Sequence, residues 1–136
     1  MGTLFLEVVT PDKVLVSQEV DMVVAPGAEG EFGVLPGHIN FLTNLIPGEL
    51  RFTYGDKREY LAVSNGFAEV SNDRVSILSD TAEKAGEIDI ERAQKALERA
   101  QKRLEKGKYD NDIDFLRTEL ALKKAIVRIK VNKKSI

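Results

Sequence analysis

The spacing of apolar residues changes between Glu83 and Ala93, and this change limits what the chain can fold into. Before this stretch apolar and polar residues alternate, which is typical of half-buried strands. After it apolar residues recur every three or four positions, which is typical of amphipathic helices. Asp89 suits a helix N-cap, because its carboxylate can accept a hydrogen bond from a free amide of the first turn. We therefore expect a β domain at residues 1–86 and a helical domain at residues 87–136.

Alternating apolar residues and turn dipeptides predict the strands of the β domain. Dipeptides of proline and glycine favour turns, because proline fixes φ and glycine tolerates positive φ. Short strands with regular turns are typical of a sandwich or a flattened barrel. The expected extended segments are residues 4–10, 13–25 (ended by Pro26-Gly27), 50–54, 60–63, 67–70 and 74–78.

Two amphipathic helices are expected after the junction. Small apolar residues form a narrow stripe on the first helix, so that another helix can approach it closely. Gly107 would end this helix, and a carboxylate between Asp110 and Asp114 would cap the second. The expected fold class is therefore α+β: an N-terminal β-sandwich or flattened barrel followed by a C-terminal antiparallel two-helix hairpin. The stripe consists of Ala93, Ala96, Leu97, Ala100 and Leu104.

The second helix carries two apolar rows rather than one. One row can contact the first helix, and the other needs a second partner. That partner is the β domain, another chain, or each in turn. The rows are Ile113, Leu116, Leu120, Val127 and Val131, and Phe115, Leu122, Ile126 and Ile129.

Charge is distributed unevenly along the chain. Residues 1–114 carry 13 Lys and Arg against 21 Asp and Glu, a net charge of −8, whereas residues 115–136 carry 7 against 1, a net charge of +6. The last helix is either a solvated face that suits its own dipole or a docking surface for an acidic partner.

Composition also excludes several kinds of protein. The chain has no cysteine, which excludes disulfides, thiolate metal sites and a cysteine nucleophile. One histidine cannot form a histidine cluster, and neither a glycine-rich phosphate loop nor a nucleophile elbow is present. No apolar run has the length of a membrane span, and residues 1–10 lack the features of a signal peptide. We expect a non-catalytic, soluble, cytosolic protein that requires no cofactor and no metal.

The most informative loop is the one expected at residues 30–38. Its three glycines and one proline indicate a fixed backbone, because apolar Phe32 lies among them. The loop is either a structural corner of the β domain or a shaped surface that presents Glu31 and His38 to a partner.

Several motifs together resemble the epsilon subunit of bacterial F-type ATP synthases. They are Gly30-Glu31-Phe32-Gly33, Leu35-Pro36-Gly37-His38, Ser64-Asn65-Gly66-Phe67-Ala68-Glu69-Val70, and Asp112-Ile113-Asp114 before Glu119-Leu120-Ala121. Their order and spacing match over nearly the whole chain. Members of that family have a β-sandwich followed by a helical hairpin, which is also what the periodicity predicts.

The resemblance implies a central-stalk component at the cytoplasmic face of the bacterial inner membrane, held there only through the complex. Its implied partners are the gamma subunit, the proton-conducting c ring and acidic segments of the catalytic alpha/beta head. Glu31, Phe32 and His38 are candidates for contact with the ring or gamma. The extended hairpin would inhibit ATP hydrolysis through a basic helix, whose candidate residues are Lys123, Lys124, Arg128, Lys130, Lys133 and Lys134.

The family also has an ATP-binding signature at the start of the first helix: an aliphatic residue, Asp, two variable residues, Arg and Ala. The resemblance therefore implies ATP as a regulatory ligand of the folded hairpin. Lys124 stands where the family's nucleotide binders have an arginine, and a lysine lacks the two-pronged guanidinium. The alternative, which the residues alone favour, is that Asp89 is simply a helix cap and Arg92 an exposed ion-pair partner. The candidates are Glu83, Ile88, Asp89, Arg92, Ala93, Arg99, Lys124 and Arg128.

Two other functions fit parts of the pattern. Six basic residues in positions 123–134 suit a nucleic-acid-binding module, but aromatic residues for base stacking are missing there and the remainder of the chain is acidic. A free-standing ATP sensor would need tight nucleotide binding without a stalk partner. We expect no nucleic-acid partner.

Overall fold

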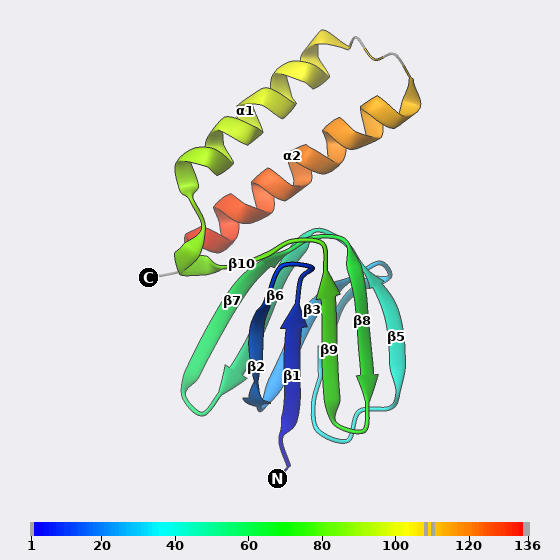
Figure 1. The fold of residues 1–136 in the computed structure, drawn as a ribbon, viewed down its shortest axis with the longest axis vertical. Coiled ribbons are helices and arrows are strands. Elements are labelled where there is room, and N and C mark those ends of the chain that lie inside the picture. Colours follow the sequence, from blue (N-terminus) through cyan, green and yellow to red (C-terminus); the bar gives the residue numbers. More distant parts are fainter. Residues whose placement is uncertain (1, 108, 110, 135–136) are drawn as a thin grey trace.

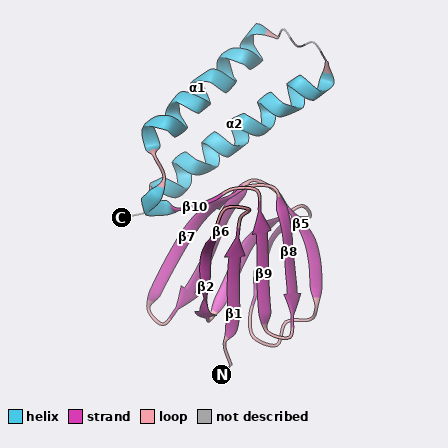
Figure 2. Ribbon diagram, in the orientation of Figure 1, coloured by secondary structure: helices cyan, strands magenta, loops and turns pink. Residues whose placement is uncertain are grey.

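The computed structural model describes residues 2–107, 109 and 111–134 of the 136-residue chain. A β-sandwich forms one part, and two antiparallel helices stand on one end of it (Figures 1 and 2). The elements are β1 (Leu4–Val9), β2 (Val14–Val20), β3 (Met22–Gly27), β4 (Gly30–Val34), β5 (Phe41–Leu45), β6 (Gly48–Tyr54), β7 (Lys57–Val63), β8 (Gly66–Ser71), β9 (Arg74–Ser79), β10 (Ala82–Lys84), the 3-10 turn η1 (Ala85–Glu87), α1 (Ile90–Lys106) and α2 (Asp112–Asn132).

The strands form one hydrogen-bonded sheet that folds into two layers. Their order is β10-β7-β6-β3-β5-β8-β9-β1-β2, with β4 paired to β3. Neighbours run antiparallel except for β1 and β9, which are parallel. A short corner at Gly27 and Leu45 joins β3 to β5 and so links the layers. The predicted sandwich, followed by two packed helices, is confirmed.

The core lies between the layers and follows the alternation of the sequence. On β1, Leu4, Leu6 and Val8 are fully buried, while their neighbours are only half-buried. Phe52 on β6 and Leu61 on β7 complete the centre of the core. Burial of one such side chain stabilises the fold by about 1.5–3 kcal/mol. Every fully buried member of this cluster lies within residues 4–82, so the sandwich has a core that does not depend on the helices.

Several details of the β domain differ from the sequence expectations. The run at 13–25 is two strands, because the chain bends at Asp21, whose carboxylate accepts a hydrogen bond from the Gly55 amide (2.8 Å). Pro26 and Gly27 do not end this run but lie within β3. The first half of the expected loop at 30–38 is the strand β4, paired with β3.

The strands β5 and β10 were not expected. In β5 an exposed position is occupied by the apolar Leu42, so apolar and polar residues do not alternate there. The strand β10 is only three residues long, which is too short to show a periodic pattern. The β7 strand also begins at Lys57, earlier than the apolar pattern indicates.

Both helix ends expected near α1 are confirmed. The Asp89 carboxylate accepts a hydrogen bond from the Arg92 amide (3.1 Å), and Gly107 adopts a left-handed conformation at φ 60°. The second N-cap is an amide rather than a carboxylate, because Oδ1 of Asn111 accepts from the Asp114 amide (3.0 Å). The expected candidate Asp110 lies outside the described residues.

Small residues form the contact between the helices, as the stripe on α1 predicts. Ala93 and Ala100 on α1 are buried, as are Thr118 and Ala125 on α2. The Thr118 hydroxyl donates to the Asp114 carbonyl (2.9 Å), so this buried polar group is satisfied within its own helix.

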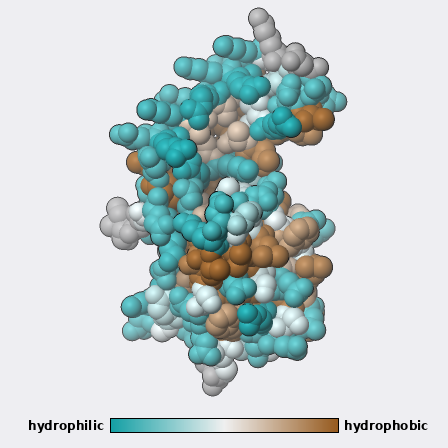
Figure 3. All heavy atoms as spheres, in the orientation of Figure 1, coloured by the Kyte–Doolittle hydropathy of each residue, from teal (hydrophilic) through white to brown (hydrophobic). Residues whose placement is uncertain are grey.

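The two apolar rows expected on α2 are only partly buried. Val131 is fully buried where the helix reaches the sandwich, but Ile113, Phe115 and Leu116 are 59%, 40% and 60% exposed. Figure 3 shows apolar surface at the end of the hairpin away from the sandwich and in a band across one face of the sandwich. Phe67 on β8 and Leu78 on β9 are exposed cross-strand neighbours. None of the helices in the described ranges is long and apolar enough to cross a membrane.

Candidate functional site

A cleft of about 500 Å³ separates the end of the sandwich from the helical hairpin. Its floor is formed by the ends of β7 and β10 and by the turn between β1 and β2. Its roof is formed by small residues of the helices, Ala96, Ala121 and Ala125, so the charged side chains at its sides have room around them. The volume is in the range of small-molecule sites.

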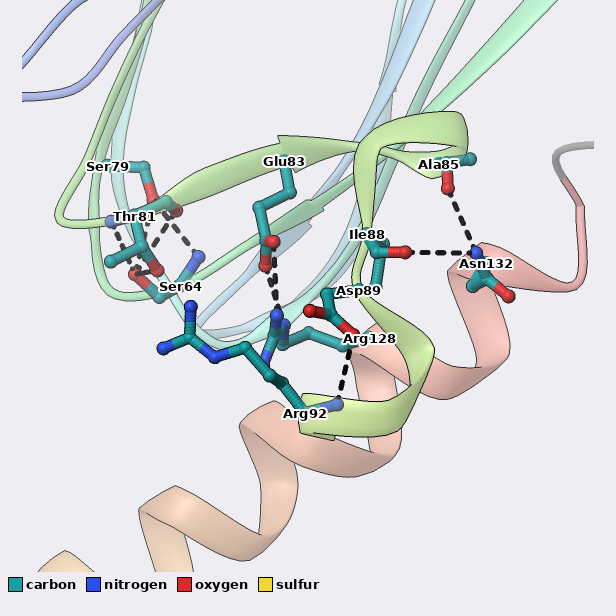
Figure 4. A network of polar contacts seen from close by, with 10 residues as sticks. All are labelled: Ser64, Ser79, Thr81, Glu83, Ala85, Ile88, Asp89, Arg92, Arg128 and Asn132. Carbon is teal, nitrogen blue, oxygen red and sulfur yellow. Dashed lines mark hydrogen bonds and ion pairs between the residues drawn. The ribbon is translucent and has the colours of Figure 1, made fainter. Parts of the chain in front are cut away.

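Four of the eight ATP-binding candidates line this cleft. They come from three elements: β10, α1 and α2. Figure 4 shows that the Arg92 side chain points from the start of α1 toward the loop that carries Ser64 and Thr81. The four are Glu83, Arg92, Lys124 and Arg128.

Glu83 and Arg128 form a two-pronged ion pair across the junction. The Nε and one terminal nitrogen of Arg128 donate to the two carboxylate oxygens of Glu83, at 2.6 and 3.1 Å. The side chains are 32% and 23% exposed, so water screens the pair only in part. Because Glu83 belongs to the sandwich and Arg128 to α2, the pair ties the hairpin to the sandwich (Figure 4).

The strand that carries Glu83 is held by a cluster of three hydroxyl groups. The Ser64 hydroxyl accepts from the amide and the hydroxyl of Thr81 (2.9 and 3.0 Å), and the Ser79 hydroxyl donates to the Thr81 carbonyl (2.7 Å). Ser64 and Ser79 are buried and have hydrogen-bond partners, which fixes the chain just before β10 (Figure 4).

The other four candidates do not line the cleft. Ile88 is buried under the end of α2, Asp89 caps α1, Ala93 is buried between the helices, and Arg99 is exposed. The signature thus combines side chains that build the helix start with others that face the cleft.

Asn132 makes a second polar contact between the hairpin and the sandwich, one that the sequence did not predict. The side-chain amide of Asn132 donates to the carbonyls of Ala85 and Ile88 (3.3 and 3.4 Å). A small apolar cluster surrounds it, in which Val131 and Ala62 are buried. An asparagine near the chain end gives no periodic signal, so this contact was not recognisable from the sequence.

Two of the three ring or gamma candidates, Phe32 and His38, are linked through Phe41 of β5. Its ring packs edge-to-face with Phe32 and with His38, at centroid distances of 5.3 and 6.2 Å. The His38 Nδ1 donates to the Ile39 carbonyl (2.7 Å), and the Gly37 amide donates to the Asp73 carboxylate (2.7 Å). The turn at 35–38 is therefore anchored to the sandwich.

Glu31 is held by Arg51, another residue that the sequence did not reveal. Two terminal nitrogens of Arg51 donate to the Glu31 carboxylate at 3.0 and 3.1 Å. These hydrogen bonds lower the pKa of Glu31 against the opposing effect of burial, with a further contribution from the charges of Arg51 and Lys134. The hydrogen bonds that Arg51 donates to Glu31 likewise raise the pKa of Arg51.

The six basic candidates, four on α2 and two just after it, fall into three groups. Arg128 and Lys134 pair with the sandwich residues Glu83 and Glu49. Lys123, Lys130 and Lys133 are exposed and Lys124 lines the cleft. No cluster of acidic or histidine side chains suited to a metal ion is found among residues 2–107, 109 and 111–134.

Comparison with known proteins agrees with the fold over residues 3–85 and 87–133. A family model for the beta-sandwich domain of the ATP synthase delta/epsilon chain matches residues 3–85, and a model for its long alpha-helix domain matches residues 87–133. The ATP synthase epsilon chain of Syntrophobacter fumaroxidans is 51% identical over 130 residues, 96% of each chain. That of Desulforamulus reducens is 53% identical over 126 residues, 92% of this chain and 93% of its own.

A solved structure gives the same result. A chain in the cryo-EM structure of the Euglena gracilis mitochondrial ATP synthase, OSCP/F1/c-ring in rotational state 1, matches with a TM-score of 0.80 at 30% identity, over 96% of this chain and 81% of that one. The fold and these similarities define the class, a non-catalytic subunit of an ATP synthase. The chain belongs to the ATP synthase delta/epsilon chain family, and its bacterial relatives above are epsilon chains.

Proposed function

We propose that this chain works in the central stalk of a bacterial ATP synthase, at the cytoplasmic face of the inner membrane. Its sandwich binds the gamma subunit and the c ring, and its hairpin is an arm that inhibits ATP hydrolysis when it leaves the sandwich. Membership of the epsilon-chain family supports the first part. The independent core of the sandwich supports the second, because the sandwich keeps its fold when the hairpin moves.

The observation that carries the proposal is the narrow contact between hairpin and sandwich. In the part of the chain that the structure describes, the last turns of α2 and the residues just after it hold the hairpin to the sandwich. They do so through the Glu83–Arg128 and Glu49–Lys134 ion pairs, Asn132 and one small apolar cluster. The N-terminal half of α2 leaves Ile113 and Leu116 exposed. A contact of this size allows docked and undocked states that differ by only a few kcal/mol.

Undocking would release both charge and apolar surface from α2. Arg128 and Lys134 leave their carboxylates and join the exposed Lys130 and Lys133 on one basic segment. Charge attraction then favours binding to acidic segments of the alpha/beta head, while the exposed apolar residues of α2 supply a packing surface.

ATP is proposed as a regulatory ligand of the cleft rather than a substrate. Arg92, Lys124 and Arg128 provide three cations at a site of suitable volume. Arg128 is already bound to Glu83, so a phosphate at Arg128 has to replace that carboxylate. A ligand that binds only the docked hairpin stabilises it by mass action, which relieves inhibition as ATP rises.

The test adds the full chain, or a version that ends at Gly86, to a catalytic head depleted of its own epsilon subunit. We expect the full chain to inhibit ATP hydrolysis and the shortened chain not to, with inhibition weakening as ATP increases. Equal behaviour of the two versions would mean that the hairpin does not inhibit ATP hydrolysis and that the chain acts only in coupling. If inhibition by an Arg92→Gln variant weakens with ATP as much as inhibition by the parent does, ATP does not regulate the hairpin through this cleft.

A further inference from the structure

Four charged side chains form a continuous chain of contacts from β4 to the turn just after α2. Arg51 holds Glu31 with two hydrogen bonds and reaches one oxygen of Glu49 with a third (3.2 Å). The other oxygen of Glu49 is bound by the Lys134 ammonium at 2.5 Å. We call Glu31, Arg51, Glu49 and Lys134 the charge chain. It connects the candidate ring contact with the hairpin.

Lys134 is the member of the charge chain that the hairpin contributes. Its ammonium also lies over the ring of Tyr60, 5.0 Å from the centroid, so it is held against β6 and β7. The Glu49 side chain is only 18% exposed, whereas Glu31 is 53% exposed and accessible to a partner. The accessible end and the hairpin end are thus joined through a half-buried carboxylate.

The charge balance of this patch depends on the hairpin. With the hairpin docked, two carboxylates and two cations cancel. When the hairpin leaves, Lys134 goes with it and the patch carries one net negative charge, with one oxygen of Glu49 unoccupied. The lowered pKa of Glu31, to which the charge of Lys134 contributes after Arg51, indicates that the two ends act on each other already in the docked state.

Resting on the function proposed above, in which the sandwich binds the c ring, and with Glu31 as the candidate contact, we propose that Lys134 and a cationic segment of the ring compete for this acidic patch. A cation at Glu31 repels Lys134 and releases Arg51 to bind Glu49 more fully, so partner binding loosens the docked hairpin. By linkage, undocking strengthens the binding of the cationic segment by the same factor. Because these pairs are partly exposed, the factor is about two- to fivefold.

The test measures docking directly in the isolated full chain. The natural sequence has no cysteine, so Asp56→Cys in the β6–β7 turn and Glu98→Cys on α1 provide two unique, exposed sites for a fluorescent donor and acceptor. The probe is an acetylated tetra-arginine amide peptide at low salt, where screening is weakest. We expect the peptide to raise the undocked-to-docked ratio about two- to fivefold.

Matched variants separate competition from general charge effects. Glu31→Gln should abolish the response, whereas Glu29→Gln, an exposed acid two residues away that takes no part in the charge chain, should keep it. Lys134→Gln should raise the undocked fraction without peptide and tighten peptide binding about two- to fivefold, and Lys133→Gln should do neither. An unchanged response in Glu31→Gln, or unchanged peptide affinity in Lys134→Gln, overturns the inference.

The measurement contains no catalytic head. Lack of competition therefore overturns this inference without affecting the inhibition proposed above. Failure of the inhibition assay overturns the proposed function while competition in the isolated chain stands.

Discussion

Removing the Glu83–Arg128 pair should shift the hairpin strongly toward the undocked state. The pair has the two-pronged geometry of the strongest ionic hydrogen bonds, with contacts of 2.6 and 3.1 Å. It also joins the two domains directly, so its energy acts on docking rather than on the stability of either domain. The changes are Glu83→Gln, Arg128→Gln and both together.

The size of the effect follows from the exposure of the pair. Fully exposed ion pairs contribute about 0.2–1 kcal/mol, whereas hydrogen bonds to charged groups contribute about 1.5–3 kcal/mol. With side chains 32% and 23% exposed, the coupling between Glu83 and Arg128 should lie between these limits, at about 1–2 kcal/mol. This corresponds to a change of about five- to thirtyfold in the docking equilibrium.

The assay is the donor–acceptor distance between labels at positions 56 and 98, measured for the parent, both single variants and the double variant. Each single variant should undock the hairpin, and the double variant should add little to the larger single effect. Lys130→Gln is the control, because Lys130 lies on the same helix and is exposed. A coupling below about 0.3 kcal/mol, the usual error of additivity, would refute the reasoning.

Three further predictions concern the sandwich and the helix start. A Cβ at Gly66 would lie 1.8 Å from the Leu78 carbonyl oxygen, so Gly66→Ala should lower the free energy of unfolding by more than about 3 kcal/mol in a urea titration, whereas Gly86→Ala, with nothing within 4 Å, should cost less than about 1 kcal/mol. Hydrogen bonds from Arg51 lower the folded-state pKa of Glu31, so this contribution to stability is complete above the ordinary glutamate pKa and is lost as pH falls through the lowered one. Stability should therefore fall less steeply in Glu31→Gln than in the parent between about pH 5 and pH 3, and equal slopes would contradict the assignment. Asp89→Ala should cost about 1 kcal/mol of helix stability and speed hydrogen exchange in the first turn of α1; unchanged exchange would mean that the cap contributes nothing.

Local chemistry predicted much of this fold. The alternation of Leu4, Leu6 and Val8 gave the buried face of β1, and Asp89 and Gly107 marked the ends of α1. In each case the signal lies within a few residues, so the sequence carries it directly.

Features that depend on distant partners were not predictable. β10 is a strand only because β7 lies beside it, and Glu31 belongs to a strand because β4 pairs with β3. In the same way, the family resemblance indicated Glu83 and Arg128 as candidates for ATP binding. Their direct ion pair was not predictable, because it depends on how α2 docks on the sandwich. Glu49, Arg51 and Asn132 gave no signal because no local pattern requires them.

The claim that the hairpin must leave the sandwich to inhibit is tested most directly by locking it in place. In a chain with Glu83→Cys and Arg128→Cys, a short thiol crosslinker replaces the natural ion pair with a covalent tie between the same two elements. ATP hydrolysis by an epsilon-depleted head is then followed with crosslinked and uncrosslinked protein. We expect the uncrosslinked chain to inhibit at least as strongly as the parent and the crosslinked chain not to inhibit. Equal inhibition by both would show that the hairpin need not leave the sandwich.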